Sequence, residues 1–494
     1  MDPYKTQRSR ASSRPRICIV GAGVSGLRCA DILLQHGFDV TILEARDRIG
    51  GRVCQAKLPS GQRIDIGPNW IHGTDDNPIM DLAKETNTVT YAWGEGFKEI
   101  FDESGKALEE SNKLHGEMWD IVLEAFEYSA KNTSTIDPQL SLYDFFEEKV
   151  KERFPDATKH EHQRKIVMQF SRMWGAMVGS PVHQQSLKYF WLEECIEGET
   201  LFCASTYQKI MEHIAKPALD MGQVKLSTRV NHIDARDSTI AVHTEDGKQF
   251  HCDEVVMTAP LGWLKLHKDT FVPPLPPHFT QAVDAIGYGC LEKVYITFPK
   301  AFWSEGYTIR ENQPSPGFTH WLPPSYSLDT NPNRWNQESV DLASLPDSCS
   351  HPTLLFYIFG DQSKAFSKVF AALPSQDAQE AYLTKFFKPY YSLLPHYVDM
   401  SPDCTPVSCI ATNWVADELA GYGSYCNFQK GLQNGDKYIE IMREGLPDRG
   451  LWFAGEHTSP FVALGTISGA YMSGEAVAKR IVGAYDKAIV KSSL

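Results

Sequence analysis

The sequence predicts an α/β fold, in which a Rossmann-like dinucleotide-binding domain stands beside a second, α+β domain. Two observations support this. The apolar run at residues 16–20 leads directly into three glycines, Gly21, Gly23 and Gly26, and helical spacing of apolar residues follows them. A second apolar run at residues 39–44 then completes a strand–turn–helix–strand unit. The length of 494 residues allows more than one domain.

Each part of this unit has a separate physical role. Gly21 makes the tight turn, Gly23 lets a pyrophosphate approach the backbone, and Gly26 allows close packing of helix on strand. The pyrophosphate is then expected at the helix N-terminus, where free N–H groups favour an anion. Gly37 ends the helix, and Glu44 can accept hydrogen bonds from an adenosine ribose. These features predict a bound dinucleotide without separating FAD from NAD.

The run that follows Glu44 favours FAD over NAD. Residues 46–52, RDRIGGR, add a glycine pair, which permits close backbone approach, and the guanidinium of Arg52, which suits a diphosphate. A solvated basic loop is the alternative interpretation. This run resembles the flavin-containing amine oxidase family, in which the corresponding arginine contacts FAD phosphate. The resemblance extends from Ile17 to about Ile481 and is to the polyamine (spermine) oxidase-like members.

The resemblance implies an FAD site that is assembled from both ends of the chain. Residues 67–73 resemble the segment beneath the flavin ring, and residues 227–233 the segment whose valine backbone holds the adenine. Residues 452–458 resemble the second FAD signature. The FAD contacts implied in this way are Gly21, Gly23, Val24, Ser25, Gly26, Glu44, Ala45, Arg46, Gly51, Arg52, Gly67, Pro68, Asn69, Trp70, Val230, Pro260, Trp414, Tyr425, Gly455, Glu456, Thr466 and Ile467.

FAD is expected to bind without a covalent link. Monoamine oxidases attach the flavin through a cysteine at the position of Ser424, and Cys426 is offset from it by two residues. Residues 465–470 open a terminal helix with small or apolar residues at helical spacing. If this helix points its N-terminus at the pyrimidine end of the flavin, its dipole stabilises the reduced, anionic ring.

Lys293 is the first of two predicted catalytic residues. Residues 289–298 predict a strand whose alternation places Val294, Ile296 and Phe298 on one face and Lys293 on the other. From the residues alone, a solvated edge lysine is the alternative. The position matches the family lysine that holds a water against flavin N5. An amine there assists proton transfer and reoxidation by oxygen, and burial lowers its pKa.

His72 is the second predicted catalytic residue, and it is also a predicted substrate contact. In polyamine-oxidising members the corresponding histidine faces the substrate, where it can accept a hydrogen bond and titrate near neutral pH. A hydrogen-bonded core histidine is the alternative. Tyr425 is expected at the flavin face, near Trp414. Thr466 replaces a second aromatic residue of the family, which argues against a two-ring cage. Trp174 is a further candidate for the substrate contacts, with a core position as the alternative.

Composition limits the partners. The net charge of −14 argues against nucleic acid and suits polyamines, although an acidic surface also serves solubility. The eleven cysteines show no metal-ligand spacing, so no metal is expected, and no apolar run predicts a membrane span. We expect a cytoplasmic monomer or weak homodimer. The terminal Ser492-Ser493-Leu494 lies near the peroxisomal pattern but lacks its basic residue, so that compartment is an alternative.

The FAD-binding domain is predicted to be discontinuous. It comprises residues 14–95, 205–268 and 405–494. Residues 96–204 and 269–404 form the α+β substrate-binding domain, and residues 1–13 are expected to be a disordered lead-in. Acids that hold a remote ammonium of the substrate are expected at the rim of the site. The acidic run at residues 193–199 is one candidate, with a solvated loop as the alternative.

The resemblance also implies the reaction. A neutral amine with its α C–H over flavin N5 loses hydride to give an imine, which water converts to an aldehyde and a shorter amine. Oxygen returns the flavin to its oxidised state and yields hydrogen peroxide. Spermine, spermidine and their N-acetyl derivatives are the expected substrates. A monoamine or L-amino-acid oxidase of the same family, a demethylase-like protein and a non-catalytic FAD-binding protein are the alternatives.

Overall fold

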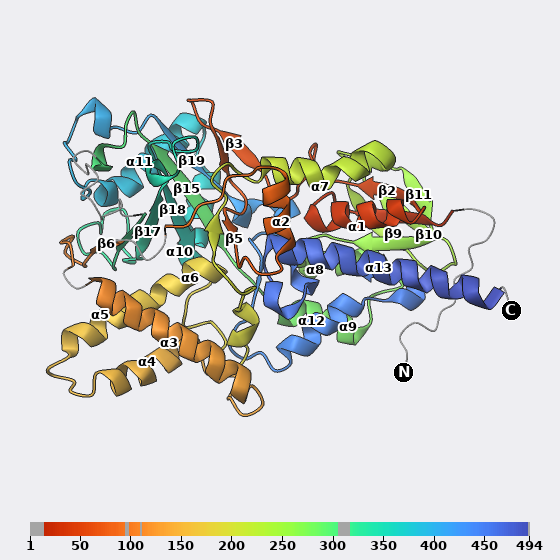
Figure 1. The fold of residues 1–494 in the computed structure, drawn as a ribbon, viewed down its shortest axis with the longest axis horizontal. Helices are drawn as coiled ribbons and strands as arrows, with labels where there is room; N and C mark the ends of the chain where they lie inside the picture. Colours follow the sequence, from red (N-terminus) through yellow and green to blue (C-terminus); the bar gives the residue numbers. More distant parts are fainter. Residues whose placement is uncertain (1–13, 94–97, 109–110, 305–316, 493–494) are drawn as a thin grey trace.

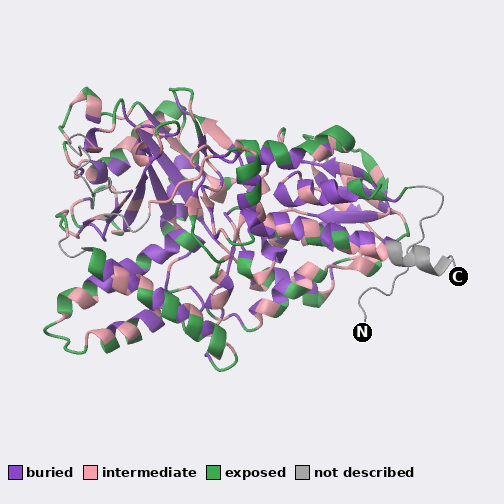
Figure 2. Ribbon diagram, in the orientation of Figure 1, coloured by how far each residue is buried: buried purple, intermediate pink, exposed green. Residues whose placement is uncertain are grey.

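The computed structural model describes residues 14–93, 98–108, 111–304 and 317–492. The predicted lead-in at 1–13, the predicted domain limit at 95/96 and the last two residues lie outside the described residues. Two sheet-based parts lie side by side along the long axis of the molecule (Figure 1). In both, the sheets are largely buried between other elements (Figure 2).

A five-stranded parallel sheet forms the core of the first part, which confirms the predicted α/β fold. β1 (Arg16–Val20) pairs with β2 (Asp39–Leu43) on one side and with β12 (Glu254–Met257) on the other. β21 (Leu451–Phe453) and β8 (Gln223–Lys225) are the edges, and all pairs are parallel. Apolar, β-branched runs suit these strands because both faces of the sheet are covered.

Three helices cover one face of this sheet. α1 (Val24–Gln35) packs between α7 (Gln208–Met221) and α13 (Ile467–Ser492), and the three share one apolar cluster with Ile17, Ile19 and other sheet residues. A four-stranded sheet covers the opposite face and forms a second cluster with it. Its strands are β11 (Gln249–Cys252), β10 (Ile240–Thr244), β9 (Val230–Asp234) and β13 (Phe271–Val272). The glycine-rich turn therefore lies at the end of a rigid, fully packed layer.

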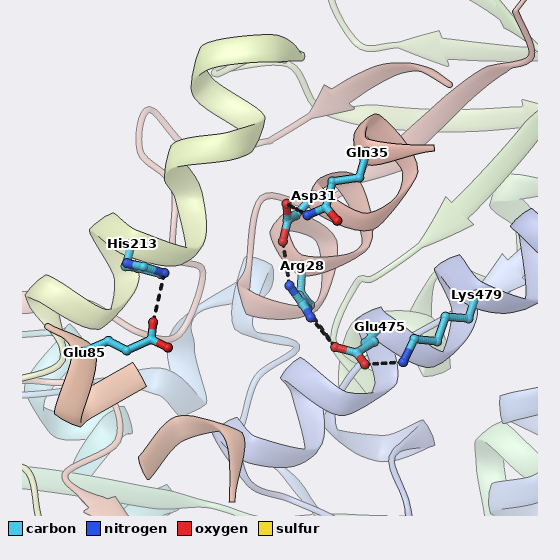
Figure 3. A network of polar contacts seen from close by, with 7 residues as sticks. All are labelled: Arg28, Asp31, Gln35, Glu85, His213, Glu475 and Lys479. Atoms are coloured by element: carbon cyan, nitrogen blue, oxygen red, sulfur yellow. Dashed lines mark hydrogen bonds and ion pairs between the residues drawn. The ribbon is translucent and has the colours of Figure 1, made fainter. Parts of the chain in front are cut away.

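Polar contacts link α1 to α13, and a separate pair links α7 to the helix at residues 78–85 (Figure 3). Arg28 of α1 donates from Nε to Glu475 of α13 at 3.0 Å and from Nη1 to Asp31 at 2.6 Å. His213 of α7 lies 3.6 Å from Glu85, the last residue of the short helix α2 (Pro78–Glu85), but both side chains are more than half exposed. Such exposed pairs contribute little to stability. The His213–Glu85 pair therefore adds little to the buried apolar cluster that α1, α7 and α13 share.

A six-stranded mixed sheet forms the core of the second part. Its order is β19-β15-β18-β17-β16-β6, and every pair is antiparallel except β16 with β6. In that order the strands are Ser408–Ala411, Leu291–Thr297, Thr353–Phe359, Gln337–Asp341, Phe318–Trp321 and Lys98–Phe101. Helices α10 (Gly360–Ala371) and α11 (Gln376–Tyr391) contribute to the cluster on one face. A separate helical cluster contains α3 (Ser111–Asn132), α4 (Leu142–Arg153) and α5 (Glu161–Ser171).

The other regular elements are short and connect these layers. The helices are α2 (Pro78–Glu85), α6 (Gly175–Val178), α8 (Leu261–Leu266), α9 (Pro277–Ala285) and α12 (Gly435–Glu444). The strands are β3 (Gln55–Lys57), β4 (Arg63–Asp65), β5 (Trp70–Ile71), β7 (Leu201–Phe202), β14 (Gly287–Tyr288) and β20 (Cys426–Asn427).

The chain crosses between the two parts several times. The parallel sheet takes its strands from three separated stretches of sequence, near residues 16–43, 223–257 and 451–453. β19 joins the six-stranded sheet, although it lies within the stretch 405–494. β5 likewise pairs with β7, which lies in the stretch 96–204. The predicted domain limits themselves stay a prediction.

Candidate functional site

Of the three glycines in the glycine-rich turn, only Gly23 has open space where a side chain would lie. A Cβ on Gly21, whose φ is +111°, would lie 2.4 Å from Thr258 Oγ1, and one on Gly26 would lie 2.1 Å from the Gly21 carbonyl oxygen. A Cβ on Gly23 would meet no atom of the described residues within 4 Å. No side chain caps α1 at Gly23, and the buried Ser25 hydroxyl beside it has no hydrogen-bond partner in the described structure. This uncapped, open helix N-terminus fits the phosphates of a dinucleotide.

Glu44 holds the glycine-rich turn against the loop that follows it. One carboxylate oxygen accepts from the Ala22 N–H at 2.7 Å and the other from the Arg46 N–H at 2.8 Å. The Gly50 N–H donates in turn to the Ala22 carbonyl oxygen at 2.8 Å. A carboxylate has about four lone-pair directions, so each oxygen can still accept a ribose hydroxyl. Glu44 therefore has a structural role that the sequence motif did not indicate.

An ion pair connects the two ends of the chain. Arg52 Nη1 lies 3.0 Å from Glu456 Oε1 and 2.6 Å from the Ser424 carbonyl oxygen. Burial lowers the pKa of Arg52, but Tyr288 and Glu456 outweigh it, so the guanidinium stays charged. Burial raises the pKa of Glu456, and Arg52 outweighs that effect. Two predicted FAD contacts from distant motifs thus form one charged pair beside Ser424.

Lys293 lies inside the second sheet and not at its edge. It is in β15, between β18 and β19, and its side chain is 6% exposed. Its Nζ donates to the carbonyl oxygen of Gly67, the first residue of the segment predicted to lie beneath the flavin. Burial lowers the pKa of Lys293 to about 7, although Asp65, Cys54 and Glu292 oppose the change. The structure therefore brings Lys293 and the segment 67–73 together and places the amine near its point of protonation at neutral pH.

A chain of hydrogen bonds involves Asn69 and Trp70 of the same segment. Trp70 Nε1 donates to Tyr357 Oη at 3.0 Å, and Tyr357 Oη donates to Asn69 Oδ1 at 3.0 Å. Asn69 Nδ2 donates to Tyr295 Oη at 3.1 Å. Sequence reasoning gave neither tyrosine a role in the site. Alternation places Tyr295 on the same strand face as Lys293, but Tyr357 is its neighbour only through the register of β15 on β18.

His72 follows β5 directly. Its environment corrects the expectation that its imidazole titrates near neutral pH. Burial lowers its pKa to about 4, so the imidazole stays neutral and does not titrate near neutral pH. A neutral imidazole can still accept a hydrogen bond from an amine. The His72 carbonyl oxygen accepts from Asn77 Nδ2 at 3.1 Å, and Asn77 Oδ1 accepts from the Ser468 hydroxyl in α13 at 2.8 Å. His72 is thereby fixed to the helix that begins beside Thr466.

A neutral, partly buried His72 makes stability depend on pH. Unfolded histidine has a pKa of about 6.5, so between pH 6.5 and 4 the unfolded chain binds a proton that the folded chain does not. Stability therefore falls as the pH falls through that window. We expect His72→Gln to remove about 2 kcal/mol of the stability difference between pH 7 and pH 5, measured by urea unfolding. His36→Gln, at an exposed position, is the control. An unchanged pH dependence in His72→Gln would contradict this assignment.

The aromatic residues predicted near the flavin occupy different settings. The Tyr425 hydroxyl donates to the Met177 carbonyl oxygen at 2.8 Å, and its ring lies close to Gly465 at the start of α13. Trp414 opens a short 3₁₀ turn, and the next residue, Val415, donates its N–H to Glu292 at 2.8 Å. Tyr425 therefore lies close to the helix N-terminus that was expected to face the flavin.

Thr466 and Trp174 have structural roles in the described residues. The Thr466 hydroxyl accepts from the Gly469 N–H at 3.0 Å and donates to the Ala463 carbonyl oxygen at 2.7 Å, so it caps α13. Trp174 is 7% exposed and packs edge-on against Phe190 in the helical cluster. A substrate contact at either residue stays a prediction.

The remaining predicted FAD contacts lie in several loops and at the starts of several elements. A Cβ on Gly67 would lie 2.1 Å from the Arg52 carbonyl oxygen, so only glycine fits there. Arg46 pairs with Asp417 at 2.8 Å, which ties the basic loop to the Trp414 turn. Val230 begins β9, Pro260 precedes α8, Ile467 begins α13, and the Gly455 N–H donates to Ser473. Ala45, Gly51 and Pro68 lie in the connecting loops, and Val24 is the first residue of α1.

The described residues contain no group of three or more His, Cys, Asp or Glu side chains that could hold a metal ion. Within the same residues, none of the helices combines the length and the apolar character that crossing a bilayer requires. Cys426, the cysteine nearest to Ser424, is buried in β20, and its N–H donates to Glu456 at 3.3 Å.

Comparison with known proteins gives consistent matches over almost the whole chain. The family model for flavin containing amine oxidoreductase matches residues 24–482. Probable polyamine oxidase 4 of Arabidopsis thaliana is 25% identical over 473 residues, which cover 93% of this chain and 86% of that protein. Lysine-specific histone demethylase 2 of Homo sapiens is 26% identical, over 94% of this chain and 53% of that protein. A solved structure of a putrescine oxidase with redesigned cofactor binding superposes with a TM-score of 0.70 at 18% identity. It covers 95% of this chain and 99% of its own, and shares the fold.

Proposed function

The chain belongs to the flavin-containing amine oxidoreductase family, and from this premise we propose that it oxidises a polyamine with molecular oxygen, giving an aldehyde, a shorter amine and hydrogen peroxide. The cofactor is FAD. When bound, the flavin supplies the hydride acceptor, which no side chain can replace. The chain's own residues hold this cofactor, orient the amine and move protons. Gly23, Ser25, Glu44, Arg52 and Glu456 would hold the cofactor, since the open helix N-terminus and the charged pair suit its diphosphate.

The contact between Lys293 and Gly67 is the observation that carries the proposal. It places a buried amine against the segment predicted to lie beneath the flavin ring. Because burial lowers its pKa to about 7, Lys293 Nζ can both donate and accept a proton at neutral pH. This is what the return of electrons to oxygen requires of a neighbouring group, since peroxide leaves with two protons.

His72 supports the recognition of an uncharged nitrogen. Its ring is neutral because burial lowers its pKa to about 4, so it places no positive charge beside the amine. A neutral amine is required because an ammonium nitrogen has no lone pair to support loss of hydride. Polyamines in water are protonated, so the site has to favour the uncharged form of one nitrogen and bind the others as ammonium.

Glu193 supports binding of a remote ammonium. Glu193 is the one acid of the run at residues 193–199 that is partly buried, since Glu194, Glu197 and Glu199 are exposed. Its Oε1 accepts from the Phe428 N–H at 3.0 Å, and burial raises its pKa to about 8. Burial raises the pKa of Tyr425, and the Glu193 carboxylate adds to that effect. An approaching ammonium would favour the ionised carboxylate and gain a partner of opposite charge.

Peroxide release across a panel of amines tests the proposal. Spermine, spermidine and their N-acetyl forms are compared with benzylamine and L-amino acids, each at saturating oxygen. We expect peroxide from at least one polyamine, with a kcat/KM well above that of any other amine. Turnover of benzylamine or an amino acid, with none of the polyamines active, would contradict the polyamine assignment and support another oxidase of the same family.

Glu193→Gln is expected to weaken polyamine binding selectively. Loss of one charged contact raises KM for the active polyamine about tenfold, which corresponds to about 1.4 kcal/mol, and leaves kcat nearly unchanged. The matched control is Glu194→Gln, at an exposed position in the same loop. Steady-state kinetics of the two variants check this. Equal KM values in Glu193→Gln and in the unsubstituted protein would remove Glu193 from the substrate site.

A further inference from the structure

Glu292 is a buried carboxylate that has no assigned role in the candidate site. It precedes Lys293 in β15 and is 0% exposed. Side chains alternate along a strand, so Glu292 lies on the same face as Val294 and Ile296, which belong to the apolar cluster shared with α10 and α11. Burying a carboxylate beside apolar side chains is costly unless hydrogen bonds compensate for the lost water. Glu292 therefore depends on specific donors on this face.

The donors come from residues 412–415, directly after β19. The Thr412 hydroxyl donates to Glu292 Oε2, and the Val415 N–H donates to Glu292 Oε1 at 2.8 Å. Thr412 also pairs with the backbone of Lys293. Its Oγ1 accepts from the Lys293 N–H at 2.8 Å, and its N–H donates to the Lys293 carbonyl oxygen at 2.9 Å. These hydrogen bonds join two consecutive residues of β15 to the short segment that follows β19.

The same segment carries Trp414, one of the predicted FAD contacts. Trp414 opens a 3₁₀ turn of three residues, and Glu292 accepts from the N–H of the second residue. The residue after the turn, Asp417, pairs with Arg46, a further predicted FAD contact, at 2.8 Å. The Trp414 turn is therefore fixed both to the strand of Lys293 and to the basic loop that contains Arg46.

We propose that Glu292 is a positioning residue that holds the Trp414 turn against the strand of Lys293 and thereby fixes the indole of Trp414 at the flavin. The inference rests on the proposed function for the place of Trp414 at the flavin, but not on the identity of the substrate. A 3₁₀ turn is short and its internal hydrogen bonds have poor geometry, so an external acceptor adds to its order. A contact residue keeps its geometry when buried hydrogen bonds of this kind support it.

Glu292→Met removes both acceptors and leaves a side chain that suits the apolar face. Two properties are measured without any amine. They are the ¹⁹F resonance of Trp414 in fluorotryptophan-labelled, FAD-saturated protein, assigned by its loss in Trp414→Phe, and the affinity of the apoprotein for FAD. We expect the resonance to move by more than its linewidth and FAD to bind about tenfold more weakly, since one hydrogen bond contributes about that much. Glu292→Gln should restore both values, because its amide oxygen can accept from the Val415 N–H.

A Trp414 resonance or an FAD affinity that stays unchanged in Glu292→Met would overturn the proposal. The matched control is Asp341→Leu. Asp341 is also a buried acid of the six-stranded sheet, and its Oδ1 accepts from the Ala343 N–H at 2.9 Å. Ala343 lies in a 3₁₀ turn of the same length that contains no predicted FAD contact. Equal changes in the two variants would likewise count against a specific role for Glu292.

If Glu292→Met gives no folded protein, amide exchange in the unsubstituted protein decides the matter. The proposal requires the Val415 N–H to exchange at least about tenfold more slowly than in an unstructured peptide, because a hydrogen bond to a buried acceptor protects it. Exchange at the peptide rate would overturn the proposal. Since no amine is present in any of these measurements, a failed polyamine assay is a separate result.

Discussion

Lys293→Met should retain FAD and slow turnover about 100-fold, because a positioned proton donor and acceptor contributes roughly that much. Methionine has a similar length and suits the buried setting of Lys293, which is 6% exposed. The substitution leaves the Gly67 carbonyl oxygen without its donor, which costs about 1–2 kcal/mol of stability. Flavin absorbance, thermal unfolding and stopped-flow reoxidation with oxygen separate these effects. We expect the loss of rate in the oxidative half-reaction, in which oxygen reoxidises the flavin.

The control for Lys293→Met is Lys265→Met. Burial also lowers the pKa of Lys265, to about 8, but its Nζ donates to the Asp284 carbonyl oxygen and not to Gly67. Turnover in Lys265→Met should stay close to that of the unsubstituted protein. If Lys293→Met were as active as Lys265→Met, Lys293 would have no part in the chemistry.

Gly23→Val should give a folded protein that binds FAD at least about 100-fold more weakly, a loss of about 2.7 kcal/mol. Gly23 has φ −78° and ψ 179°, which any residue adopts, and a Cβ there meets no described atom within 4 Å. The valine therefore fits the fold but occupies the space into which the cofactor phosphates are expected to approach. FAD titration by fluorescence, with circular dichroism as the check on folding, measures both properties.

Two further valine substitutions distinguish a lost binding site from a lost fold. At Gly26 a Cβ would lie 2.1 Å from the Gly21 carbonyl oxygen, so Gly26→Val should fail to fold. At Gly116, in α3, a Cβ meets no described atom within 4 Å, so Gly116→Val should fold and keep FAD. Normal FAD affinity in Gly23→Val would show that the cofactor does not approach this turn.

The fold of the dinucleotide unit could be predicted because its signals are local. The apolar run before Gly21, the spacing of the three glycines and the acid at Glu44 lie within one short stretch of chain. The structure confirms the strand, turn and helix that they predict. Alternation likewise placed Lys293 opposite Val294 on β15, although the residues alone left open whether that lysine was buried.

The polar surroundings of the site could not be read in the same way, because they depend on pairing between distant strands. Tyr357 becomes a neighbour of Lys293 through the register of β15 on β18, and Gly67 through its hydrogen bond with Lys293. The pKa of His72 depends on burial, which residue type alone does not fix. Thr466 was interpreted by its place in the family motif, whereas its hydroxyl caps α13.

The most direct test is the visible absorption spectrum of the purified protein, recorded anaerobically before and after addition of spermine. We predict the yellow spectrum of oxidised flavin at first, its bleaching by spermine, and its return when oxygen is admitted. A colourless protein that stays colourless after refolding with FAD, or a yellow protein that no polyamine bleaches, would contradict the account.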